Sequence, residues 1–143
     1  MKILGIETSC DETAAAVVEG MAIRSSIIAS QEQIHARFGG VVPEVASRKH
    51  TETLMRVVDR ALEEAGTDFD DLDAFAVTHG PGLIGSLLVG VSAAKAYHMV
   101  LRTPLFGINH LQGHVAVNFA DGSGADLALN DLPAICLIVS GGH

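Results

Sequence analysis

Hydrophobic residues in the first part of the chain occur in short runs that favour strands. Residues 2–8, 12–20 and 21–30 are rich in small or β-branched apolar residues, and polar residues separate the runs. Glu19 and Gly20 form the expected turn between the second and third runs. Although the alanines of the second run favour helix locally, the pattern predicts a β-meander whose first corner is the polar segment TSCDET.

A long helical pattern follows the glycine pair at positions 39 and 40. Apolar residues recur there at the spacing of one helical face, namely Leu54, Val57, Val58, Ala61, Leu62 and Ala65. Pro43 suits the first turn of a helix, and Gly66 is a suitable C-terminal stop. The sequence therefore predicts a helix that begins near Pro43 and ends before Gly66.

Strands and helices alternate in the remainder of the chain. Residues 73–82 predict a buried strand with a tight turn, 82–101 an apolar helix, and 104–110 a strand that leads into a short helix at His110. Residues 134–143 predict a last buried strand that ends in glycines. The order β-β-β-α-β-α-β-α-β is typical of an α/β fold, with a partly parallel mixed sheet covered by helices.

The length of 143 residues is that of one domain. Because the chain stops one strand after the last expected helix, we expect residues 1–132 to form one lobe and 133–143 to be the first strand of a second, truncated lobe. The apolar run at 82–101 approaches the length of a membrane span. Lys95 and His98 interrupt it, so we expect a buried helix.

Composition restricts the function and the location. With 48% hydrophobic and 18% charged residues the chain is expected to fold, and its net charge of −8 argues against a broad nucleic-acid surface. Five of the nine basic residues lie between positions 37 and 60, where intervals of four along Arg48, Glu52, Arg56 and Arg60 predict a paired, solvent-facing surface. No signal peptide is expected before Glu7, and two distant cysteines indicate a reducing compartment. The expected location is cytoplasmic, without membrane contact.

Two of the seven histidines have a spacing that suggests a joint role. His110 and His114 face the same side of a helix, where two imidazoles can bind one metal ion. Spacing alone supports a metal site and a chance pair equally, and a catalytic metal normally takes a third protein ligand. A zinc peptidase would carry a glutamate beside the first histidine, where this chain has Leu111. The single histidines are expected to be surface or structural residues.

Three segments rich in glycine or hydroxyl groups are further candidates. TSCDET is either a phosphate-binding corner, through backbone N–H groups and Thr8, Ser9 or Thr13, or a polar hairpin turn. The turn THGPG either binds an anion at a helix N-terminus or lets the helix pack closely on the sheet, and small residues at 82, 86, 90 and 94 favour packing. The last segment, VSGGH, suits phosphate or ribose binding at a strand end.

Five segments resemble one family in their order and spacing, the tRNA adenosine threonylcarbamoyltransferases, which were earlier described as O-sialoglycoprotein endopeptidases. The segments are GIETSCDETAAAVV, GGVVPEVASRKH, VTHGPGLIGSLLVG, NHLQGH and VSGGH. The resemblance spans essentially the whole chain but less than half of the family's usual length. It implies the first lobe of an actin-like ATPase (ribonuclease H-like) fold.

The resemblance also implies a reaction and a site. The reaction transfers a threonylcarbamoyl group from threonylcarbamoyl-adenylate (threonylcarbamoyl-AMP) to an adenosine beside the tRNA anticodon. One divalent metal ion, iron or zinc, is expected on His110 and His114, with an aspartate of the second lobe as a further ligand. Asp11 and Glu12 are the candidate catalytic carboxylates, since the corner with Ser9 resembles the family's phosphate-facing loop. The expected adenylate contacts are Ile138, Val139, Ser140, Gly141 and Gly142, and Ser9 is expected to bind the substrate on its phosphate side.

The resemblance implies three partners: tRNA, a shorter non-catalytic paralogue that pairs through first-lobe helices, and a small ATPase. On this interpretation the 143-residue chain is inactive alone. Two alternatives stay open. One is a metal-dependent O-sialoglycoprotein endopeptidase, and the other is a non-catalytic heterodimerisation module of the same superfamily.

Overall fold

The computed structural model describes residues 1–120, 133 and 135–138. In this part of the chain the strands form one five-stranded sheet in the order β3-β2-β1-β4-β5. The strands are β1 (Lys2–Glu7), β2 (Glu12–Glu19), β3 (Ala22–Ser30), β4 (Ala74–Gly80) and β5 (Leu105–Asn109). The first three pair antiparallel, whereas β1, β4 and β5 run parallel. The predicted β-meander and mixed sheet are therefore confirmed.

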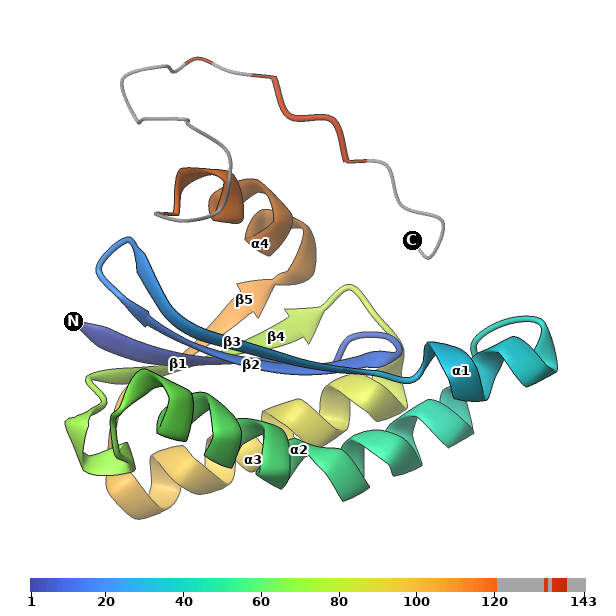
Figure 1. Ribbon diagram of the computed structural model, residues 1–143, viewed down its shortest axis with the longest axis horizontal. Coiled ribbons are helices and arrows are strands. Elements are labelled where there is room, and N and C mark those ends of the chain that lie inside the picture. Colours follow the sequence, from blue (N-terminus) through green and yellow to red (C-terminus); the bar gives the residue numbers. More distant parts are fainter. Residues whose placement is uncertain (121–132, 134, 139–143) are drawn as a thin grey trace.

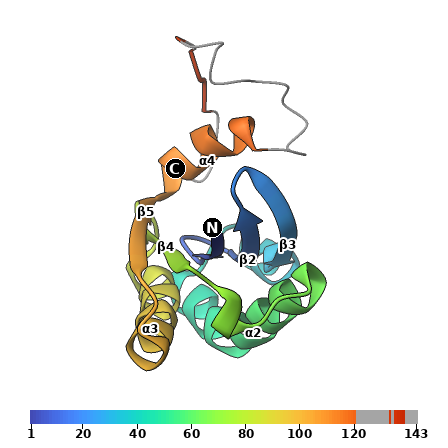
Figure 2. The same cartoon turned by 90° about the vertical axis from the view of Figure 1, so that its left-hand side faces the viewer.

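Helices lie on both sides of this sheet. The long helices α2 (Pro43–Ala65) and α3 (Ile84–Leu101) lie side by side under one face, and the short helix α4 (His110–Ala116) lies on the other side (Figures 1 and 2). A short α1 (Glu32–His35) connects β3 to α2. Three 3₁₀ turns complete the described elements: Ala36–Phe38, Phe69–Asp71 and Val117–Phe119.

The ends of α2 follow from its sequence. Pro43 occupies the first turn, where its missing N–H costs no hydrogen bond, and Gly66 ends the helix in the left-handed region with φ 61°. Its apolar face packs on β2 and β3, and Leu54, Val57 and Val58 join the core around Leu4 and Phe75. The predicted helix is confirmed at both ends.

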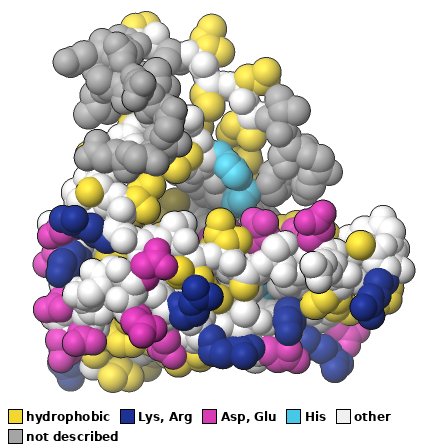
Figure 3. All heavy atoms as spheres, viewed as in Figure 1, with side chains coloured by type: hydrophobic (Ala, Val, Ile, Leu, Met, Phe, Trp, Pro, Cys, Tyr) yellow, Lys and Arg dark blue, Asp and Glu magenta, His cyan; other side chains and the backbone are white. Residues whose placement is uncertain are grey.

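The opposite face of α2 carries paired charges. Arg48 contacts Glu44 at 2.7 Å, and Lys49 contacts Glu52 at 3.2 Å, all on exposed side chains. Such exposed pairs contribute little to stability. The predicted solvent-facing, paired surface is confirmed, but the partners differ from the predicted ones: Arg48 pairs with Glu44, and Glu52 pairs with Lys49. Figure 3 shows charged side chains of both signs over the helical half of the molecule.

Helix α3 packs on the sheet through its small residues. Ser86, Gly90 and Ala94 are buried, and a Cβ added at Gly90 would lie 2.5 Å from the hydroxyl oxygen of Thr8. The predicted packing role of this small-residue stripe is confirmed. The expectation of a buried helix is wrong for the larger residues, because the stripe alone faces the sheet and leaves Ile84, Leu88, Met99 and Val100 more than half exposed.

The exposed apolar residues give α3 the length and composition of a membrane span. Its 18 residues, Ile84–Leu101, have a mean hydropathy of 1.4, and 17% of them are buried within the described structure. The small-residue stripe nevertheless packs against β1, β4 and α2. One face of α3 is therefore part of the fold, and the other is an uncovered apolar surface.

The sequence pattern did not predict α1, and the strand that it predicted at residues 134–143 is absent from the described part of that segment, residues 135–138. Helix α1 has four residues, which is about one turn and too short for an apolar periodicity. Residues 135–138 have no regular secondary structure, and the rest of the predicted strand 134–143 lies outside the described residues. The proposed boundary between residues 132 and 133 lies outside them as well, so it stays a prediction.

Candidate metal centre

Three parallel strands end at the same edge of the sheet and bring distant residues together. β1 ends at Glu7, Thr78 lies near the end of β4, and β5 leads directly into His110. The register aligns Ile6 with Val77, immediately before Glu7 and Thr78. Because carboxyl ends of parallel strands are a common location for ligand sites, this edge is the candidate functional site.

The sequence fixes where the histidine helix begins. The side-chain oxygen of Asn109 accepts hydrogen bonds from the backbone nitrogens of Leu111 at 2.9 Å and Gln112 at 3.3 Å. An asparagine in this position satisfies N–H groups that have no partner within the helix. His110 is therefore the first residue of α4, directly after the strand, and the predicted strand-to-helix junction is confirmed.

His110 and His114 direct the same nitrogen toward one point. Their Nε2 atoms lie 3.1 Å apart, and the ring centroids are 4.6 Å apart in an edge-to-face arrangement. Two imidazole nitrogens that each lie about 2.0–2.1 Å from one ion are separated by about 2.8–3.4 Å at octahedral to tetrahedral angles. The two residues therefore fit a shared metal ion.

The two histidines do not form a complete ligand set by themselves. Within residues 1–120, 133 and 135–138, no group of three or more histidine, cysteine, aspartate or glutamate side chains could hold a metal ion. A catalytic metal normally takes three protein ligands. A further ligand must then come from outside the described residues.

Glu7 contacts His110 at Nδ1, the ring nitrogen that does not face His114. Its Oε2 lies 3.0 Å from Nδ1 of His110 and accepts a hydrogen bond from the Thr78 hydroxyl at 2.6 Å. The backbone N–H of Ser9 donates to the other carboxylate oxygen. Burial raises the pKa of Glu7, but hydrogen bonds from Thr78, Ser9 and His110 outweigh it and hold the pKa below its usual value.

Sequence analysis missed Glu7 as a site residue. The available signal was a charged residue at the end of an otherwise apolar strand, at the same edge as His110. Within the described residues, Glu7 rather than Asp11 or Glu12 is the carboxylate that hydrogen-bonds to His110. Asp11 is half-buried and Glu12 is exposed, so their catalytic role stays a proposal.

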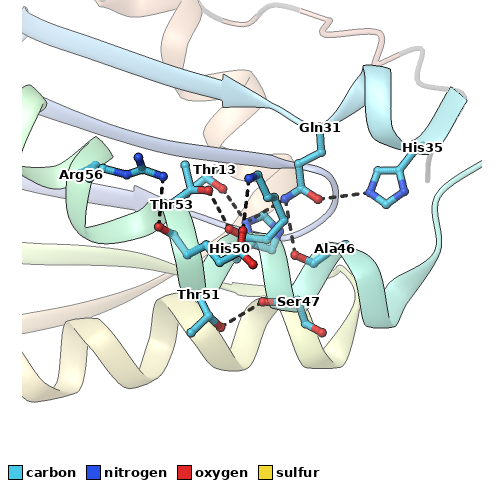
Figure 4. A network of polar contacts seen from close by, with 11 residues as sticks. Thr13, Gln31, His35, Ala46, Ser47, His50, Thr51, Thr53 and Arg56 are labelled. Atoms are coloured by element: carbon cyan, nitrogen blue, oxygen red, sulfur yellow. Dashed lines mark hydrogen bonds and ion pairs between the residues drawn. The ribbon is translucent and has the colours of Figure 1, made fainter.

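The hydroxyl groups of the TSCDET corner mostly serve the fold. The Thr8 hydroxyl donates to the Ser86 carbonyl at 2.8 Å, and that of Thr13 lies 2.8 Å from Nδ1 of His50, which is fully buried (Figure 4). Ser9 differs, since its hydroxyl lies 3.2 Å from Nδ1 of His110. Ser9 is thus the one predicted corner residue that the described contacts join to the histidine pair.

The THGPG turn holds this corner in place. Leu83 donates its backbone N–H to the Ser9 carbonyl at 2.7 Å, and a Cβ added at Gly82 would lie 2.5 Å from that oxygen. Gly82 has φ 158°, and the Gly80–Pro81 peptide bond is cis. Glycine is required at 82 because the backbone of the turn approaches the corner too closely for a side chain.

The predicted adenylate contacts are outside the described residues, with one exception. Ile138 is 37% exposed and lies in a segment without regular secondary structure. Val139, Ser140, Gly141 and Gly142 lie outside the described residues. Their predicted role in binding the adenylate stays a prediction.

A solved structure supports the fold class. YeaZ from Pseudomonas aeruginosa superimposes with a TM-score of 0.60 at 21% identity, covering 76% of this chain and 43% of that chain. Together with the mixed sheet and the helices on both of its sides, this likeness defines an α/β fold of the kind seen in YeaZ. The predicted fold class is confirmed.

Sequence comparison then identifies the family. A family model described as TsaD, tRNA N6-adenosine threonylcarbamoyltransferase, matches residues 22–143. A protein of that name from Clostridium novyi (strain NT) is 57% identical over 146 residues, which cover 100% of this chain and 41% of the relative. One from Dehalococcoides mccartyi (strain CBDB1) is 56% identical over 144 residues, covering 100% and 43%. The chain belongs to the tRNA N6-adenosine threonylcarbamoyltransferase family and spans about two fifths of the length of these relatives.

Proposed function

We propose that this chain is the first, metal-binding part of an enzyme that transfers a threonylcarbamoyl group from threonylcarbamoyl-AMP to an adenosine next to the tRNA anticodon. The observation that carries the proposal is the convergence of the Nε2 atoms of His110 and His114, 3.1 Å apart, at the carboxyl edge of the parallel strands. Membership of the transferase family supplies the reaction class. The 143-residue chain is proposed to be inactive alone because its described ligand set is incomplete.

The residues of this edge have distinct proposed roles. His110 and His114 would hold one divalent ion, iron or zinc, and the bound ion would supply Lewis acidity toward the carbamoyl-phosphate group of the substrate. Strand β5 and the Asn109 cap fix the position of His110. The Ser9 hydroxyl lies 3.2 Å from Nδ1 of His110, and Ser9 is proposed to bind the phosphate side of the substrate. Ile138 and the following VSGG residues are proposed to contact the adenylate, and Asp11 or Glu12 to serve in proton transfer.

The endopeptidase alternative lacks support from the geometry. A metallopeptidase needs a carboxylate that activates a water molecule at the metal. Glu7, the described carboxylate that hydrogen-bonds to His110, contacts Nδ1 rather than the Nε2 side, and Thr78 and Ser9 already donate to it. Chelator-sensitive release of peptides from a sialoglycoprotein, lost on substitution of His114, would restore this alternative.

Substitution of His110 tests the proposed function. In a full-length protein, meaning this sequence extended to the length of its relatives, His110→Ala should reduce tRNA threonylcarbamoylation to background because one of two convergent nitrogens is removed. The matched control is His98→Ala, since His98 lies at the end of α3 and bonds to the Thr103 carbonyl. Modified adenosine is quantified by mass spectrometry of digested tRNA. Retained modification in the His110 variant would refute the metal role.

We further propose that α2 and α3 bind the shorter, non-catalytic paralogue. An apolar hollow of about 420 Å³ lies between these helices, lined by Thr51, Leu54, Met55, Leu88, Val89, Ser92 and Ala93. The exposed Ile84 and Met99 extend the apolar surface along α3. Burying such a surface against a partner removes it from water. A partner protein on this surface would also explain why α3 is apolar, with no need for a membrane. The other proposed partners of the full-length enzyme are tRNA and a small ATPase.

A charge in this hollow tests the paralogue proposal. Leu88→Asp in the full-length protein should abolish co-elution with the paralogue in size-exclusion chromatography, because a carboxylate would be buried at the contact. Ile28→Asp is the matched control, since Ile28 is 61% exposed on β3, away from the hollow. Equal loss of complex in both variants, or in neither, would contradict an interface on α2 and α3.

A further inference from the structure

We propose that Glu7 is a positioning residue that fixes the proton of His110 on Nδ1, so that the lone pair of Nε2 points to the metal position. The inference rests on the proposed metal role of the histidines. It adds a residue that is separated from His110 by 103 positions in the sequence. Glu7 does not bind the ion; it acts through His110.

The Glu7 carboxylate can only be the hydrogen-bond acceptor in its contact with the His110 imidazole. A carboxylate accepts hydrogen bonds and has no proton to donate. At 3.0 Å from Oε2, Nδ1 of His110 must therefore be the donor. In a neutral imidazole a proton on Nδ1 leaves Nε2 as the unprotonated nitrogen, and Nε2 is the atom that converges with His114.

The surroundings of Glu7 keep its carboxylate in this orientation. The Thr78 hydroxyl donates to Oε2 from β4, and the Ser9 backbone N–H donates to Oε1 from the corner. Glu7 and His110 are 31% and 12% exposed at their side chains, so water competes only partly for the contact. A carboxylate that orients a metal-binding imidazole in this way is a recurrent feature of protein metal sites.

Glutamine at position 7 would conflict with this arrangement. If its oxygen accepted from Thr78 and His110, its amide NH₂ would face the Ser9 N–H, donor against donor. If its oxygen accepted from Ser9 instead, the NH₂ would face Nδ1 of His110 and favour the tautomer with the proton on Nε2. Glu7→Gln therefore keeps the size of the side chain but loses either the hydrogen bond from the Ser9 N–H or the hydrogen bond from Nδ1 of His110.

The tautomer of His110 is the first measurement. In the metal-free full-length protein with ¹⁵N-labelled histidine, two-bond ¹⁵N–¹H correlations distinguish a proton on Nδ1 from one on Nε2. We expect the Nδ1–H form in the wild type and a shift toward Nε2–H in Glu7→Gln. An Nε2–H form in the wild type would overturn the proposal even if no variant folded.

Zinc affinity is the second measurement. Zn²⁺ is titrated against a chromophoric chelator, with thermal unfolding as the check of folding. Glu7→Gln should weaken Zn²⁺ binding by about 10- to 100-fold, the range found for residues that orient metal ligands. Glu19→Gln is the matched control, because Glu19 pairs with Arg24 at the far end of β2. Thr78→Val, which removes one donor to Glu7, should give a smaller loss in the same direction.

The results separate this inference from the proposed function. Wild-type affinity in Glu7→Gln, together with tRNA modification by the wild type, would overturn the role of Glu7 and leave the transferase proposal intact. A loss of Zn²⁺ affinity in Glu7→Gln from a wild-type protein that modifies no tRNA would support Glu7 as the positioning residue and refute the transferase proposal.

Discussion

Buried polar residues, His50 above all, hold the TSCDET corner in position beside the candidate metal centre through hydrogen bonds. His50 of α2 is fully buried and contacts three groups: the Thr13 hydroxyl at 2.8 Å, the Gln31 amide at 3.4 Å and the Cys10 carbonyl at 3.0 Å (Figure 4). His35 in turn lies 3.1 Å from the Gln31 side-chain oxygen. The prediction that these single histidines are structural is confirmed, and His50 ties the TSCDET corner to α2.

The same residue predicts how stability depends on pH. Burial lowers the pKa of His50 below its usual value of 6.5, and the unfolded chain therefore binds this proton more readily than the folded chain. The contribution to stability is present above pH 6.5 and is lost as pH falls toward the folded-state pKa. We expect the free energy of unfolding of the wild type, measured with urea, to fall between pH 7.5 and 5.5.

Replacement of His50 provides the control for that pH dependence. His50→Gln should lower stability at pH 7.5, because three buried contacts are disturbed. The decrease between pH 7.5 and 5.5 should nevertheless be smaller than in the wild type. An unchanged decrease would assign the pH dependence to other groups.

Cys10 also contacts His50, through its carbonyl group. Burial, reinforced by the hydrogen bond that the thiol donates to the Asp11 carboxylate and by the negative charge of that carboxylate, raises the pKa of the Cys10 thiol to about 11. The thiol is therefore protonated at neutral pH, where the thiolate is the reactive form. We expect slow alkylation of Cys10 by iodoacetamide at pH 7.5, measured by mass spectrometry, compared with the exposed Cys136 in the same chain. Faster labelling of Cys10 would contradict the raised pKa.

At the scale of elements, α3 depends on the absence of side chains on one face. A Cβ at Gly90 would lie 2.5 Å from the Thr8 hydroxyl oxygen and 3.5 Å from a methyl of Ile6. Gly90→Ala should therefore destabilise the fold, since overpacking costs about 1–3 kcal/mol and the gain in helix propensity recovers only about 1 kcal/mol. Thermal unfolding measures the difference.

Gly113→Ala is the matched helical control for that substitution. A Cβ at Gly113 of α4 meets no atom of the described residues within 4 Å, so the helix propensity is the main quantity that changes. We expect an unchanged or slightly higher melting temperature. Equal effects of the two substitutions would show that the contact between α3 and β1 tolerates an added methyl group.

Local signals predicted the elements well and the long-range contacts poorly. Pro43 and Gly66 mark the ends of α2 because proline and glycine act on the backbone where they stand. The histidine pair was predictable because both residues lie on one helix. The contact of Glu7 with His110 was not, since it depends on the order in which β1, β4 and β5 pair. The exposed face of α3 was missed because apolar composition does not specify which side a sheet covers.

At the scale of the whole molecule, the proposed metal site is incomplete within the described residues. The described residues supply two convergent nitrogens and the carboxylate that contacts one of them, without a third ligand in the same region. We expect the 143-residue chain to bind Zn²⁺ measurably more weakly than the full-length protein, because fewer ligands hold the ion. Equal affinity, measured by calorimetry, would show that this chain holds the complete ligand set.

Because β4 and β5 pair in parallel, the number of residues in each strand determines how far along the sheet its last side chain lies and on which face of the sheet it lies. Successive residues of a strand point to opposite faces, so deleting one residue from β5 would move His110 away from Glu7. An extra residue between Gly39 and Gly40 has no such effect, because it lies in a loop that precedes α2. A peptide tag or a fluorescent reporter is therefore best inserted at that glycine pair, where the chain can lengthen while the strand ends keep their alignment.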